Sequence, residues 1–87
     1  MIQYGKHYID QSDIDAVVDV LKNEFLTQGS QVPRFEDEIA DLCGVRHGVA
    51  LNSATSALHI ACLAIGIGEG DLVWTSAITF VASANAA

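Results

Sequence analysis

Positive charge is scarce in this sequence. Among its 87 residues there are four lysines and arginines against 11 aspartates and glutamates, which gives a formal net charge of −7. Nucleic acids and anionic membranes bind proteins through clustered lysine and arginine side chains, and the sequence has no such cluster. We therefore expect neither nucleic acid nor a membrane as a partner, and we interpret the acidity as a means of keeping the surface soluble.

Cysteine is also rare, since Cys43 and Cys62 are the only two. Each lies on an apolar helical pattern, so we expect two small buried hydrophobic side chains rather than a disulfide. No Cys-x-x-Cys or histidine pair predicts a metal site. No apolar run approaches 18 residues, and no charged segment precedes an apolar one at the amino end, which favours a cytoplasmic protein.

Charge of either sign is nearly missing from the second half. Residues 1–46 hold nine of the 11 acids and all four bases, whereas residues 47–87 hold only Glu69 and Asp71. An isolated domain covers its surface with polar groups, so we expect something outside the chain to cover this half. Because the helical pattern also runs to Ala87 without a stop signal, we expect an amino-terminal fragment of a larger protein.

Two helices are predicted in the first half, after an extended arm over residues 1–9. Ser12 resembles the start of a capping box with Asp15, and one apolar stripe follows it at helical spacing. The members of this stripe are Ile14, Val17, Val18, Leu21 and Phe25. Residues 27–31 form a loop, and Pro33 opens a second helix that Gly44 ends.

The second half predicts a strand, a helix and a strand. Residues 49–51 and 72–75 are short apolar runs typical of buried strands, and residues 53–65 have helical spacing between them. Thr79 would then cap a further helix. The fold class is therefore α/β, with the arm and two helices in residues 1–47 and an incomplete strand–helix–strand unit in residues 48–87.

The segment Asn52-Ser53-Ala54-Thr55-Ser56 is the first candidate binding site. It joins the end of a predicted strand to the start of a helix, where free backbone N–H groups and the helix dipole favour an anion such as phosphate. An ordinary helix cap by Asn52 or Ser53 is the alternative, and it needs no ligand. The glycine-rich motifs of ATP and dinucleotide sites are absent, which disfavours those ligands.

Phe80 is the second candidate. It follows the second predicted strand, at the sheet edge where α/β proteins usually bind ligands, and an aromatic side chain there would cover a flat ring. The alternative is a plain core phenylalanine.

Several motifs along the whole chain resemble the DegT/DnrJ/EryC1/StrS sugar-nucleotide aminotransferases. They are the arm with Tyr4, then Phe25-Leu26-Thr27-Gln28-Gly29, Val32-Pro33-Arg34-Phe35-Glu36, Asn52 to Leu58, Gly68-Glu69-Gly70-Asp71 and Ile78 to Ala82. The resemblance implies the amino-terminal part of the large domain of a fold-type I transferase, with a helical arm and the start of a mostly parallel sheet. It also implies pyridoxal 5′-phosphate as cofactor and a homodimer.

The same resemblance implies roles for particular residues. Thr55 and Ser56 match the pair that binds the cofactor phosphate, and Phe80 matches the aromatic that stacks on the pyridine ring. Tyr4, Ala54 and the segment Glu24, Phe25, Leu26, Thr27 match positions that line the sugar-nucleotide pocket. The lysine that carries the cofactor and the aspartate that pairs with its ring nitrogen match nothing in these 87 residues, so we expect no catalytic residue and no activity from this chain alone.

Within the family, the motifs are most similar to the branch that serves pseudaminic acid synthesis. The implied reaction transfers an amino group from glutamate to C4 of a UDP-4-keto-6-deoxy-N-acetylhexosamine. Two alternatives stay open: an aminotransferase for another keto-sugar nucleotide, and a non-catalytic interaction fragment of this fold.

Overall fold

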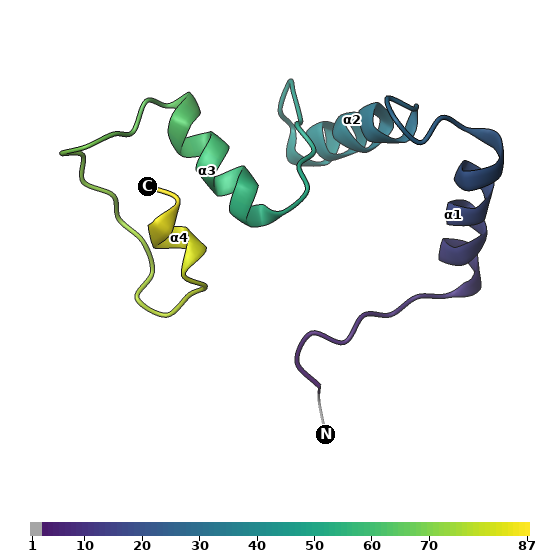
Figure 1. Cartoon of the computed structure of the whole chain (residues 1–87), viewed down its shortest axis with the longest axis horizontal. Coiled ribbons are helices and arrows are strands. Elements are labelled where there is room, and N and C mark those ends of the chain that lie inside the picture. Colours follow the sequence, from purple (N-terminus) through teal and green to yellow (C-terminus); the bar gives the residue numbers. More distant parts are fainter. Residues whose placement is uncertain (1–2) are drawn as a thin grey trace. The chain divides into compact units, whose positions relative to one another are not determined.

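The computed structural model describes residues 3–87 of the chain. Its elements are four helices, drawn in Figure 1: α1 (Gln11–Asn23), α2 (Gln31–Cys43), α3 (Ala54–Ala64) and α4 (Ala82–Asn85). These residues form two compact units, one that ends at Gly48 and one that begins at Val49. No helix within residues 3–87 is both long and apolar enough to cross a membrane.

Helix α1 begins at Gln11, before the predicted cap at Ser12. The cap is Asp10, whose Oδ1 accepts hydrogen bonds from the backbone N–H groups of Ser12 (2.9 Å) and Asp13 (3.2 Å). The Asp13 carboxylate accepts the N–H of Asp10 in return at 3.0 Å, which completes a capping box. The predicted box of Ser12 with Asp15 is therefore wrong, because Asp10 offers a charged acceptor to the orphan amides at this end of the helix.

Helix α2 begins at Gln31, so Pro33 is its third residue and not its first. Ser30 precedes the helix without forming a side-chain cap. The predicted end at Gly44 is confirmed: Gly44 has φ 66°, its N–H donates to Asp41 O at 3.1 Å, and the N–H of Val45 donates to Ala40 O at 3.0 Å. Glycine suits this left-handed position because it has no Cβ to clash with the carbonyl.

In the second unit, α3 agrees with the predicted helix over residues 53–65 to within one residue at each end. It closes through Gly66, which donates to Leu63 O at 3.1 Å, and Ile67, which donates to Cys62 O at 3.0 Å. The short helix α4 packs beside α3 (Figure 1). Thr79 does not cap it, because its hydroxyl lies 3.2 Å from the Ser83 hydroxyl and hydrogen-bonds there instead.

The expected strands at residues 49–51 and 72–75 are not formed. Both segments lack regular structure, and residues 3–87 contain no β-strand. A strand exists only through hydrogen bonds to a neighbouring strand, whereas a helix bonds within itself. The helical half of the predicted α/β pattern is therefore present, and its sheet is not.

Little of the apolar surface is covered. Among residues 3–87 the buried side chains are those of Ala40 and Ala82, and the apolar stripe of α1 is exposed along its length. Cys43 is exposed and Cys62 is half-buried, and both are free thiols. The expectation that both cysteines are buried is therefore wrong, because no apolar neighbour covers the faces on which they lie.

Candidate functional site

The first turn of α3 brings three of the predicted site residues together, namely Ala54, Thr55 and Ser56. Ser53 caps the helix from an extended conformation, and its Oγ accepts the Ser56 N–H at 3.2 Å. The two serine hydroxyl oxygens lie 3.1 Å apart, with Ser53 donating to Ser56. Of the two caps that the sequence left open, Ser53 is the one that forms.

This cap leaves part of the helix end open. Within residues 3–87, the N–H groups of Ala54 and Thr55 form no hydrogen bond. The hydroxyl of Ser56 accepts from Ser53 and so keeps its own proton to donate. Two open amides, the exposed Thr55 and the Ser56 hydroxyl form a set of donors at the positive end of the α3 dipole. Such a donor set fits a phosphate dianion and does not need the cap to break.

Phe80 lies two residues before α4 and is 73% exposed. The hollow of this unit is lined by Leu58, Cys62, residues 73–76 and Ser83, and neither Phe80 nor Thr55 is among these residues. An exposed ring is available to cover a ligand, and the interpretation of Phe80 as a core side chain does not fit this structure.

The predicted pocket residues of the first unit lie in the loop between α1 and α2. Glu24 is the C-cap residue that follows α1. Its carboxylate accepts hydrogen bonds from Ser30 Oγ at 2.5 Å and Gln31 Nε2 at 2.8 Å. Among the residues between them, Phe25 is 84% exposed, Leu26 is 67% exposed, and Thr27 is exposed as well. Glu24, Phe25, Leu26 and Thr27 therefore share one loop whose two ends are joined by side chains.

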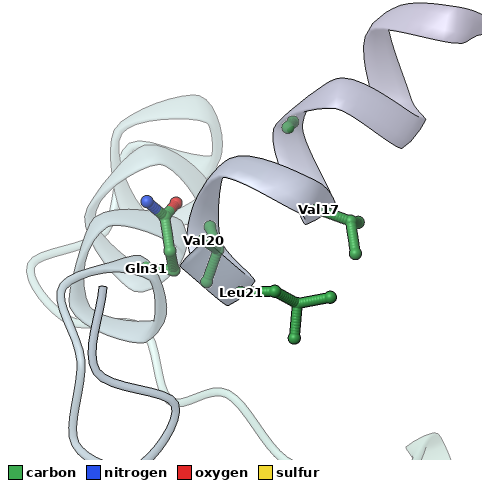
Figure 2. Close-up of a pocket in the computed structure, with 5 residues that line it drawn as sticks. Val17, Val20, Leu21 and Gln31 are labelled. Atoms are coloured by element: carbon green, nitrogen blue, oxygen red, sulfur yellow. The ribbon is translucent and has the colours of Figure 1, made fainter. Parts of the chain in front are cut away.

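A shallow apolar hollow lies where α1 meets the start of α2. Figure 2 shows Val17, Val20 and Leu21 extending from α1, with Gln31 of α2 beside Val20. A second, smaller hollow of about 100 Å³ lies behind the loop, lined by Val20, residues 25, 26, 28 and 29, and the first two residues of α2. The first hollow is mostly apolar, whereas Gln28 and Gln31 give the second a partly polar lining; neither is lined by a titratable side chain.

Tyr4 lies in a turn with Gly5, which has φ 75°, so this part of the predicted arm is not extended. Tyr4 is fully exposed, and its ring packs against nothing in the first unit. No group of three or more histidine, cysteine, aspartate or glutamate residues within residues 3–87 is placed to hold a metal.

Ser30, Gln31 and Gly29 belong to the candidate site but were not predicted as site residues from the sequence. Ser30 and Gln31 reach Glu24 across six and seven residues. That separation matches neither helical nor strand spacing, so no periodic pattern could reveal the pairing. Gly29 in a polar stretch predicts a loop, but it does not predict that the Glu24 side chain joins the two ends of that loop.

Comparison with known proteins gives a family match over most of the chain. The sequence profile of the DegT/DnrJ/EryC1/StrS aminotransferase family matches residues 7–87. No solved structure matches significantly.

Curated relatives match as well. A UDP-4-amino-4,6-dideoxy-N-acetyl-beta-L-altrosamine transaminase of Campylobacter jejuni (strain 81-176) is 53% identical over all 87 residues, which cover 23% of that relative. A UDP-4-amino-4-deoxy-L-arabinose–oxoglutarate aminotransferase of Shewanella sediminis is 42% identical over 88% of the chain and 20% of the relative. A GDP-perosamine synthase of Caulobacter vibrioides is 40% identical over 88% of the chain and 21% of the relative. The chain thus spans about a quarter or less of the length of the relatives that it matches.

Proposed function

Because the chain belongs to the DegT/DnrJ/EryC1/StrS aminotransferase family, we propose that it works as the amino-terminal part of a pyridoxal phosphate enzyme that aminates a sugar nucleotide. The observation that carries this proposal is the 53% identity over all 87 residues to a UDP-sugar transaminase. The proposed fold is the large domain of a fold-type I transferase, in which residues 49–51 and 72–75 become strands once neighbouring strands are present.

We assign the cofactor phosphate to the first turn of α3. The open N–H groups of Ala54 and Thr55 would donate to it, together with the hydroxyls of Thr55 and Ser56. Phe80 would cover the pyridine ring and exclude water from it. When bound, pyridoxal phosphate supplies the electron sink for amino transfer, while the protein binds and orients it. The residues of this chain hold the cofactor, and the proton transfers belong to groups outside it.

Residues of the first unit would bind the sugar nucleotide. Phe25, Leu26 and Thr27 are exposed on one loop, and together with Glu24 and Tyr4 they match pocket positions of the family. Ala54, in the second unit, matches a further position. Apolar side chains beside a few polar groups are typical of small-molecule sites.

The proposed substrate is a UDP-4-keto-6-deoxy-N-acetylhexosamine of pseudaminic acid synthesis, aminated at C4 with glutamate as the amino donor. The relative whose name carries the UDP-N-acetyl-altrosamine product is 53% identical, against 40% for the GDP-perosamine synthase. We further propose a cytoplasmic homodimer, since the apolar surface of both units is large enough to need a cover.

A chimera tests the proposal. Residues 1–87 replace the matching residues of the Campylobacter jejuni relative, and the product is assayed for pyridoxal phosphate absorbance and for amino transfer to UDP-, GDP- and dTDP-keto-sugars. We expect cofactor binding and a preference for the UDP-keto-sugar. The unaltered relative is the positive control.

The phosphate assignment has its own variant in this chimera. Thr55→Val with Ser56→Ala removes both hydroxyls and keeps the backbone amides. We expect the cofactor to bind about a hundredfold or more weakly, because each of the two lost hydrogen bonds to a charged group contributes roughly 1.5–3 kcal/mol. Ser76→Ala, in the same unit, should leave the affinity unchanged. A folded double variant that binds the cofactor as tightly as the unsubstituted chimera would refute the assignment.

A further inference from the structure

We propose that the Glu24 carboxylate is a positioning group: it closes the loop of residues 24–31 into one shape and so presents Phe25, Leu26 and Thr27 to the sugar nucleotide. This inference rests on the proposed function in one respect only, namely that the ligand is a sugar nucleotide. The closed loop itself is a property of this chain. Glu24 would then act through its neighbours rather than by touching the substrate with its side chain.

Both carboxylate oxygens of Glu24 are already engaged. Oε2 accepts from Ser30 Oγ at 2.5 Å, and Oε1 accepts from Gln31 Nε2 at 2.8 Å. The two donors are neighbours in sequence, so the carboxylate bridges the last residue before α2 and the first residue within it. Hydrogen bonds to an ionised acceptor are stronger than neutral ones, which favours this closed arrangement over an open loop.

The position of this charge also suits α2. The first turn of α2 contains no acidic residue, and Ser30 forms no side-chain cap. The Glu24 carboxylate, held beside Ser30 and Gln31, supplies the negative charge that the positive end of a helix dipole favours. The loop and the helix therefore stabilise the same side-chain position.

The backbone inside the loop is constrained as well. Gln28 has φ 55°, in the left-handed region that few residues other than glycine adopt. A Cβ built on Gly29 would lie 2.0 Å from the carbonyl oxygen of Phe25, so only glycine permits this close approach. The closure by Glu24 thus joins the ends of a turn whose interior is already narrow.

The remaining polar groups of Glu24 limit what else it can do. Its N–H donates to Val20 O at 3.0 Å as the last bond of α1. Its backbone carbonyl oxygen accepts no hydrogen bond within residues 3–87 and is therefore available to a substrate. In this proposal the backbone and the side chain of Glu24 have different roles. The backbone carbonyl faces the substrate, and the carboxylate fixes the shape of the loop.

The first experiment measures the loop in the 87-residue chain by NMR amide hydrogen exchange. In Glu24→Ala, we expect exchange of the amides of residues 25–30 to rise about four- to a hundredfold, because the variant removes two hydrogen bonds and each is worth a net factor of about two to ten. Asp37→Ala is the matched control, because this exposed acid on α2 forms no hydrogen bond or ion pair within the described residues. Unchanged exchange in Glu24→Ala would overturn the proposal.

A double variant that exchanges the side chains of residues 24 and 31, called the reversed pair below, then distinguishes a positioning role of Glu24 from direct contact with the substrate. In Glu24→Gln with Gln31→Glu, the amide at position 24 donates to the carboxylate at position 31, which restores the link with the charge moved. We expect loop exchange to return to the wild-type rate. In the chimera described above, we expect Glu24→Ala to raise the KM for the UDP-keto-sugar with little change in kcat, and the reversed pair to restore the KM.

The exchange rate and the KM contradict different hypotheses. If the reversed pair restores slow exchange but the KM stays raised, the carboxylate contacts the substrate directly and the positioning role is wrong. If the wild-type chimera does not bind UDP-N-acetylglucosamine or the keto-sugar at all, the proposed function fails, and the exchange data still decide whether Glu24 closes the loop.

Discussion

The Asp10 carboxylate illustrates how much one side chain decides at the residue scale. The hydroxyl of Ser12 donates to Asp10 Oδ1 at 2.6 Å, and this bond, followed by the backbone bond from Asp13, lowers the pKa of Asp10 below its ordinary value. A lowered pKa in the folded state means that the ionised form is the one that the fold stabilises. The capping contribution is therefore complete above the ordinary pKa of an aspartate and is lost as the pH falls through the lowered value.

The variant Ser12→Ala tests this cause. It removes the hydroxyl bond but keeps the backbone N–H of residue 12, so we expect the pKa of Asp10 to rise toward its ordinary value. A ¹³C NMR titration of the Asp10 carboxyl measures the change. In Asp10→Asn, which caps without titrating, the acid-induced loss of structure in the first turn of α1 should be smaller than in the wild-type chain. An Asp10 pKa that is the same with and without the Ser12 hydroxyl would contradict the assignment.

Gly29 is the second decisive residue. In Gly29→Ala the new methyl would meet the Phe25 carbonyl oxygen at 2.0 Å, so the loop must open, and we expect a loss of about 1–3 kcal/mol of stability. Gly68→Ala is the control, because a Cβ there meets nothing within 4 Å. We expect it to change stability by less than about 0.5 kcal/mol. Denaturant titrations of both variants and the wild-type chain, followed by circular dichroism, compare them, and equal midpoints would refute the close approach.

At the scale of elements, the cap of α3 serves two purposes. Ser53 Oγ accepts the Ser56 N–H and thereby holds the first turn in which the Ala54 and Thr55 amides stay open. In Ser53→Ala we expect the start of α3 to lose about 1 kcal/mol. Faster hydrogen exchange of the Ser56 amide would report that loss, and Ser53→Asn, which keeps an acceptor, should restore protection. Equal exchange in both variants and the wild-type chain would show that Ser53 does not act as a cap.

The elements also show what could be predicted from the sequence. The helix over residues 53–65 and the end of α2 at Gly44 were predicted because their signals are local: apolar spacing, and a glycine after the last turn. The cap of α1 was misplaced because Asp10 and Ser12 are both good acceptors, and the pattern does not rank them. Glu24 was singled out only through the family resemblance, since its partners lie at a spacing that no regular element produces.

At the scale of the whole molecule, local sequence patterns could not establish whether the predicted strands form. Residues 49–51 and 72–75 have strand-like composition, but a strand depends on a neighbouring strand, and neither segment forms a β-strand within residues 3–87. The same dependence explains the uncovered apolar surface. The 23% share of the relative's length agrees with the prediction of a fragment, and the need for a cover over the second half stays a prediction.

Trp74 reports on this surface in solution. It is the single tryptophan of the sequence and is 97% exposed. For the 87-residue chain at low concentration we therefore expect emission like that of free tryptophan in water, with a blue shift as the concentration rises and apolar faces associate. Fluorescence and sedimentation measured on the same dilution series test this. A monomer whose emission is blue-shifted at every concentration would contradict the exposed position.

The short reach of these bonds has a consequence for synthesis on the ribosome. The helix caps and the bonds from Ser30 and Gln31 to Glu24 join residues at most seven positions apart. Each can therefore form as soon as its own segment leaves the exit tunnel. The aliphatic side chains that emerge with them have no partner at that moment, and nascent chains with such surface are the ones that aggregate. We expect this polypeptide to depend most on a chaperone while these side chains are exposed during its synthesis.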